Sequence, residues 1–331
     1  AKGSHGYMPN AGFPDVRDAV ARKISREQGI ELKGDSVIMT VGAAGGLNIA
    51  LKCLLNPGEE VIVSAPYFVE YGSYAANHGG KVVPVKSLPD FSLDIEGISK
   101  ALTPNTAAMI INSPNNPTGR IYSEDDLSRL GDCLRAHAKK TGRVVYLISD
   151  EPYREIVYGG RTVPSMMKAY ENTLVVTSYS KSLSLPGERI GFVAVHPECD
   201  DHEFVIAGLV MCNRVLGYVN APALMQRIVA ELTDVTVDVS IYEKRRDVFA
   251  AGLRAAGLTF AEPEGAFYIF CKAPIDDDVK FVNYLKEYRI LAVPGSGFGG
   301  PGYFRLAYCV EDGVIGRSIP VFAEAMKNFK G

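Results

Sequence analysis

The sequence has little of the patterning that marks metal-binding or disulfide-stabilised proteins. Its six cysteines include no CxxC pair, so a structural zinc site is not expected, and we predict no metal ligands. A disulfide framework is typical of small secreted domains and is implausible in a chain of 331 residues. The thiols are therefore expected to be reduced, which favours a cytoplasmic protein.

Membrane, nucleic-acid and dinucleotide signals are also missing. No apolar run approaches the roughly 18 residues that cross a membrane. The net charge is −3, the isoelectric point is about 6.0, and the basic residues are dispersed. Nothing in the charge therefore predicts a nucleic-acid or membrane partner. No GxGxxG follows the first apolar strand, which argues against an NAD-dependent dehydrogenase.

Alternating apolar strands and helices occupy the first two-thirds of the chain. Strands are predicted near residues 37–41, 61–64, 81–85, 107–112, 144–149, 174–177 and 190–195, and helices near 44–55, 68–78 and 123–138. Continuous apolar strands between helices indicate a mostly parallel sheet covered on both faces. We therefore predict an α/β large domain spanning residues 1–235.

The pattern changes after about residue 235. A long helix near 241–256 precedes short strands near 267–270, 291–293 and 304–307, and a last helix ends near residue 329. These elements predict a smaller α+β domain spanning residues 236–331.

Polar residues gather where predicted strands end. Residues 112–116 follow one strand, Asp150 closes another, and Lys181 follows a third. Ligands of open α/β sheets bind beyond the carboxyl ends of the strands. Gly42 follows the first strand, where the next helix offers backbone N–H groups to an anion. The sequence thus predicts one pocket that holds an anion, an acid and a lysine.

These residues resemble the fold-type I enzymes that depend on pyridoxal 5′-phosphate (PLP), specifically the aspartate aminotransferase superfamily of class I/II aminotransferases. Residues 178–181 followed by Arg189 resemble its S-x-S-K motif with an arginine eight residues on. Residues 115–119 resemble its N-P-T-G loop, and residues 150–153 its D-x-x-Y motif. The resemblance runs from about residue 7 to residue 305 and implies a fold-type I architecture.

The resemblance implies roles for the residues around the cofactor ring. Lys181 matches the lysine that carries PLP as a Schiff base and then serves as a general base. Asp150 matches the carboxylate that keeps the ring nitrogen protonated. Asn116 and Tyr153 match the groups that bond to the phenolic oxygen, and Phe68 matches the aromatic residue that stacks on the ring.

The phosphate is implied to lie against Ala43 and Ala44 through their backbone N–H groups, with Ser178 and Arg189 as side-chain donors. Residues 42–44 lack the hydroxyl side chain that many relatives place there. Tyr7 resembles a tyrosine that reaches the phosphate of the neighbouring subunit, which implies a homodimer.

Arg305 matches the arginine that binds the substrate α-carboxylate, and Asn116 lies in the same implied subsite. A dicarboxylic substrate would need a second arginine, for which Arg161 and Arg214 are candidates among others. The recognisable motifs begin at Tyr7 and residue 1 is not Met, so we expect native residues before residue 1.

An aminotransferase that moves an amino group between an α-amino acid and a 2-oxo acid by a ping-pong route is therefore the first hypothesis. A PLP-dependent C–S or β-lyase of the same fold shares almost all of these residues and is the alternative. A PLP-binding regulatory module is disfavoured, because no DNA-binding domain is evident.

Overall fold

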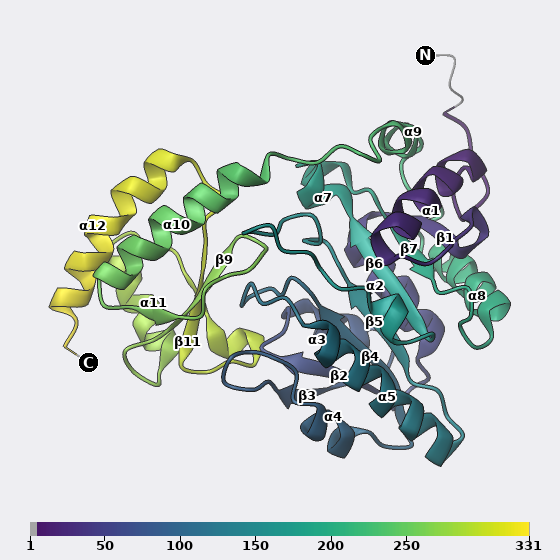
Figure 1. Ribbon diagram of the computed structural model, residues 1–331, viewed down its shortest axis with the longest axis horizontal. Coiled ribbons are helices and arrows are strands. Elements are labelled where there is room, and N and C mark those ends of the chain that lie inside the picture. Colours follow the sequence, from purple (N-terminus) through teal and green to yellow (C-terminus); the bar gives the residue numbers. More distant parts are fainter. Residues whose placement is uncertain (1–4, 331) are drawn as a thin grey trace.

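A seven-stranded sheet forms the centre of the computed structural model, which describes residues 5–330 (Figure 1). Residues 1–4, on which the expectation of a preceding segment bears, lie outside the described residues. The strands are β1 (Val37–Thr40), β2 (Glu60–Ala65), β3 (Lys81–Lys86), β4 (Thr106–Asn112), β5 (Tyr146–Asp150), β6 (Thr173–Ser178) and β7 (Gly191–Val195).

The strand order is β1-β7-β6-β5-β4-β2-β3, which puts β5 at the centre. Strands β2 to β6 pair in parallel, whereas β7 runs antiparallel to both β6 and β1. The predicted strands are confirmed to within a few residues at each end. The mostly parallel sheet is confirmed as well.

Helices cover both faces of this sheet, because alternate side chains of the strands point to opposite sides. One face packs on α2 (Gly42–Leu54), α3 (Glu70–Ala76) and α8 (His202–Val215). The other face packs on α1 (Pro14–Gln28) and α9 (Ala223–Glu231) at one end, and on α4 (Ile95–Ala101), α5 (Glu124–Thr141) and α6 (Met166–Ala169) at the other. The short helix α7 (Tyr179–Ser182) directly follows β6.

Helix α5 begins as its sequence predicts. The Ser123 hydroxyl accepts from the Asp126 backbone N–H at 3.1 Å, and the Asp126 carboxylate accepts from the Ser123 N–H at 3.2 Å. This capping box satisfies two N–H groups that the first turn of a helix leaves unpaired. Gly142, with φ of 72°, ends the helix in the left-handed conformation that glycine adopts readily.

A second sheet, formed by the C-terminal part of the chain, lies beside the first (Figure 1). It contains β8 (Thr259–Phe260), β9 (Tyr268–Lys272), β10 (Val293–Pro294) and β11 (Tyr303–Ala307), in the antiparallel order β10-β11-β9-β8. Helices α10 (Val239–Ala255), α11 (Asp278–Glu287) and α12 (Asp312–Asn328) pack on it. Within residues 5–330, no helix combines the length and apolarity needed to cross a membrane.

Candidate active site

Three neighbouring strands bring their polar ends together at one edge of the sheet. Asn112 at the end of β4 lies beside Asp150 at the end of β5, and β6 ends next to them at Ser178. The Asn112 amide donates to the Asp150 carbonyl at 2.8 Å, and its oxygen accepts from the Asn116 backbone N–H at 2.6 Å. Asn112 therefore holds Asn116, in the loop that follows β4, close to Asp150.

A cavity of about 330 Å³ opens at this edge. Every predicted site residue except Tyr7 lines it, namely Ala43, Ala44, Phe68, Asn116, Asp150, Tyr153, Ser178, Lys181, Arg189 and Arg305. Tyr7 is 95% exposed and does not line the cavity of its own protomer. The remaining lining residues are Leu47, Glu70, Tyr74, Asn112, Pro152, Ser180, Pro186 and Tyr268.

Asp150 has one carboxylate oxygen without a partner. Its Oδ2 accepts from the Tyr71 hydroxyl at 2.6 Å, whereas the buried Oδ1 has no hydrogen-bond partner within residues 5–330. Burial raises the pKa of Asp150 to about 7, against the lowering effect of the Tyr71 hydrogen bond, and Glu151 raises it further. A protonated ring nitrogen at Oδ1 would satisfy this oxygen and stabilise its charge.

Lys181 lines the same cavity and lies near two aromatic rings that pack edge to face. Its Nζ is 6.0 Å from the ring centre of Tyr153 and 5.3 Å from that of Phe267. Burial lowers the pKa of Lys181 below its ordinary value, and Arg189 and Arg305 lower it further. A lysine with a lowered pKa is more often an uncharged amine, the form that attacks a carbonyl carbon.

The amino end of α2 could bind an anion at one end of the cavity. The helix begins at Gly42, whose φ is 73°, and Val41 before it provides no side-chain cap. The first N–H groups of α2 therefore stay available to an anion. A Cβ atom on Gly42 would lie 3.0 Å from Nη2 of Arg189, so the absence of a side chain makes room for this guanidinium.

Gly46 lets α2 pack directly on the sheet. A Cβ atom there would lie 2.7 Å from Cγ1 of Val176 and 3.1 Å from Cγ2 of Val193. Real Cβ atoms essentially never come as close as the first of these distances. Any larger residue would thus displace the helix from β6, the strand that leads into Lys181.

Arg305, on β11, brings the second sheet into the site. Its Nη1 donates to Oδ1 of Asn116 at 2.9 Å, and its guanidinium lies over the rings of Tyr268 (4.5 Å) and Phe298 (4.8 Å). Its buried Nε has no partner within the described part of the chain. The hydroxyls of Tyr268 and Tyr153 are 2.9 Å apart. A rigidly held guanidinium that forms no ion pair with the described residues is suited to bind a carboxylate with two hydrogen bonds.

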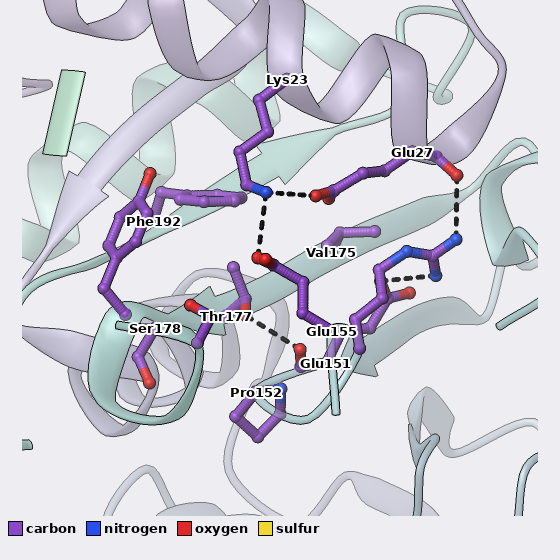
Figure 2. A pocket seen from close by; sticks show the side chains of 12 residues that line it. Lys23, Glu27, Glu151, Pro152, Glu155, Val175, Thr177, Ser178 and Phe192 are labelled. Carbon is purple, nitrogen blue, oxygen red and sulfur yellow. Dashed lines mark hydrogen bonds and ion pairs between the residues drawn. The ribbon is translucent and has the colours of Figure 1, made fainter. Parts of the chain in front are cut away.

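Charged side chains form a network around a second, smaller hollow next to the segment that follows Asp150 (Figure 2). Lys23 of α1 donates to Glu27 at 2.5 Å and to Glu155 at 2.9 Å, and the Thr177 hydroxyl donates to the Glu151 carbonyl at 2.9 Å. The hollow between these side chains measures about 20 Å³, which is room for about one water. This network therefore fixes the loop after Asp150 and leaves no room for a cofactor.

Sequence reasoning missed several residues that line the cavity or bond to its lining residues. Tyr71 and Tyr268 matter through their bonds to Asp150 and Tyr153, which are 79 and 115 positions away in the chain. Neither tyrosine stands in a motif that signals these partners. Glu70 and Tyr74 lie one helical turn apart on α3, and only the direction of that helix brings them to the cavity.

The two arginines named as candidates for a distal acid lie elsewhere. Arg161 is 3.8 Å from the Glu264 carboxylate, and Arg214 donates to the Asn10 side chain at 3.5 Å. Neither lines the cavity.

The three features of the cavity fit PLP. A buried acid with an unpaired oxygen matches the ring nitrogen, a lysine of lowered pKa matches the aldehyde, and the open helix end with Arg189 matches the phosphate.

Comparison with known proteins identifies the family. The family profile described as aminotransferase class I and II matches residues 1–318. The aspartate/prephenate aminotransferase of Thermus thermophilus is 33% identical over 98% of this chain and 84% of that protein. The aromatic-amino-acid aminotransferase 2 of Thermococcus litoralis is 33% identical over 93% of this chain and 80% of that protein.

An aminotransferase from Eubacterium rectale has a crystal structure that superposes on this fold with a TM-score of 0.96. It is 40% identical and covers 99% of this chain and 83% of its own. Family profile, relatives and solved structure all agree. This chain therefore belongs to the class I and II aminotransferases, a family of PLP-dependent enzymes that act on amino acids.

Proposed function

We propose that the cavity at the end of β4, β5 and β6 is where this aminotransferase binds PLP and exchanges amino groups between an α-amino acid and a 2-oxo acid. The observation that carries this proposal is the buried Asp150 oxygen without a partner, in the same cavity as Lys181. A buried carboxylate is costly unless a cation or donor meets it, and a protonated ring nitrogen is such a partner.

Each of these residues would have a separate role in the reaction. When bound, PLP supplies an aldehyde carbon that reacts with amines and a ring that withdraws electrons from the substrate Cα. Lys181 would hold the cofactor and, once freed, move the proton at that Cα. Asp150 would hold the proton at the ring nitrogen. Tyr153 and Asn116 would donate to the phenolic oxygen.

The remaining residues would bind the phosphate and ring of the cofactor and the α-carboxylate of the substrate. The N–H groups of Ala43 and Ala44, with Ser178 and Arg189, would bind the phosphate. Phe68 would cover the ring. Arg305 would bind the substrate α-carboxylate, and its bond to Asn116 supports this role because it aims the guanidinium into the cavity.

We predict that the absorbance band of the PLP-loaded enzyme at about 420 nm will disappear when a suitable amino acid is added. The band will return on adding a 2-oxo acid, because the second half-reaction restores the aldehyde. A panel of amino acids followed by spectrophotometry, with glutamate formation as the second assay, tests this. Steady release of ammonia and pyruvate with no need for a 2-oxo acid would instead identify a β-lyase.

We also propose that the active enzyme is a homodimer in which Tyr7 of each protomer completes the phosphate site of the other. Tyr7 is 95% exposed and does not line the cavity of its own protomer, which supports this. A two-fold interface repeats each contact, so both sites would be completed together.

Light scattering is expected to give twice the chain mass, and dilution to nanomolar concentration should reduce activity as the dimer dissociates. Tyr7→Phe should release PLP more readily because the phosphate loses one donor. A monomer with full activity at nanomolar concentration would contradict this proposal.

We further propose a domain boundary near residue 235, in the segment between the end of α9 at Glu231 and the start of α10 at Val239. A cytoplasmic location is proposed as well, because all six cysteines are free thiols.

A further inference from the structure

Each cationic side chain of the cavity already has a contact or a proposed role. Among the described residues, Lys181, Arg189 and Arg305 are the cations that line it. Arg189 lies against Gly42 at the anion-binding end, and Arg305 bonds to Asn116 where the α-carboxylate is proposed to bind. With Lys181 as the proposed carrier of the cofactor, no cation of this protomer is left in the cavity for a second substrate carboxylate.

Helix α3 instead brings an acid to the cavity. Glu70 opens this helix two residues after Phe68, and Tyr74 follows one turn later. The Tyr74 hydroxyl donates to the Glu70 carboxylate, and both side chains line the cavity. This hydrogen bond holds the carboxylate in place on the same wall as the residue proposed to cover the ring.

Asp150, the other acid of the cavity, is proposed to contact the cofactor and not the substrate side chain. Asp150 is buried, bonded to Tyr71, and proposed to meet the ring nitrogen. Glu70 is exposed to solvent at the cavity wall, on the side from which a ligand would enter. Its charge is available to the substrate side chain.

We propose that Glu70 is a specificity-determining residue that disfavours amino acids with a distal carboxylate and favours those whose side chain ends in an amine. The inference rests on the proposed function, since it assumes that Arg305 binds the α-carboxylate. Two like charges a few ångströms apart at a protein surface change binding by about tenfold or more, and opposite charges do so in the other direction.

The test measures kcat/KM of the holoenzyme for lysine, ornithine, aspartate and glutamate, with alanine as the neutral reference. We expect the wild-type enzyme to prefer the two basic amino acids over the two acidic ones. Glu70→Gln should lower that ratio by about tenfold, with the same shift in apparent Kd from the cofactor absorbance in single half-reactions. Added salt should reduce the difference between the two enzymes, because it screens an exposed charge.

Glu96→Gln is the matched control. Glu96 also stands in the first turn of a seven-residue helix and bonds to a residue one turn on, Lys100, yet it does not line the cavity. It should leave the ratio unchanged.

The inference would be overturned if the wild-type enzyme prefers aspartate or glutamate and Glu70→Gln leaves the ratio of kcat/KM for basic over acidic amino acids unchanged. That result would indicate a cation from the partner subunit. The proposed function fails separately, if no amino acid, alanine included, changes the cofactor absorbance.

Discussion

Replacing Lys181 with alanine is expected to abolish turnover while the protein still folds. The change would remove both the amine proposed to hold the cofactor and the base proposed to move the proton at the substrate Cα. Loss of proton transfer alone costs about 10² to 10⁴ in rate, and loss of the covalent attachment adds to it. Folding should survive, because the Lys181 amine makes no hydrogen bond or ion pair to another of the described residues that would be broken.

Borohydride reduction followed by peptide mass spectrometry measures the attachment directly. The label should appear on the peptide that contains Lys181 in the wild-type protein and be absent from the variant. Lys140→Ala, on the exposed end of α5, serves as the control and should retain both label and activity. Label on a different lysine would refute the assignment.

Replacing Asp150 with asparagine is expected to lower the rate by about 10² to 10³, the loss typical of removing a preorganised electrostatic group. Asparagine keeps the size of the side chain and a partner for Tyr71, but it cannot hold a proton at the ring nitrogen by charge. Near-normal turnover, with an unchanged cofactor spectrum, would show that another acid holds that nitrogen.

The same substitution should change how the stability of the cofactor-free protein depends on pH. The folded-state pKa of Asp150, about 7, lies above the ordinary value of 3.8, so the fold favours the protonated carboxyl. Its stabilising contribution is full at pH below about 4 and is lost as pH rises through about 7. Between pH 5 and pH 8, urea unfolding should show the wild-type protein losing more stability than Asp150→Asn, on the order of 2–3 kcal/mol.

Residues in contiguous motifs were predictable, and residues whose role comes from a distant contact were not. Lys181, Asp150 and Asn116 lie in short segments at strand ends, where local pattern and position along the sheet agree. Tyr71 lies in no motif, and only the packing of α3 against the sheet places its hydroxyl on Asp150. The sequence around Tyr71 cannot indicate a contact with a residue 79 positions away.

The fold differs from the sequence analysis in three respects. The apolar run of β7 indicates a strand, but it does not indicate that this strand runs antiparallel, because direction depends on the path of the preceding turn. The sequence analysis assigns no element to residues 14–28, although Pro14 at the start of α1 and Gly29 after its end are ordinary helix-boundary signals. The predicted strand near 291–293 is reduced to Val293–Pro294.

The glycine at position 46 has a consequence for which molecules the protein accepts as cofactor. Because Gly46 lets the backbone of α2 rest against the side chains of Val176 and Val193, no side chain of the helix at this position can adjust the spacing between the helix end and Lys181. A ligand must reach from one to the other with its own covalent length. The proposed site would therefore discriminate by molecular length, and a phosphorylated aldehyde one bond longer or shorter would satisfy only one end at a time.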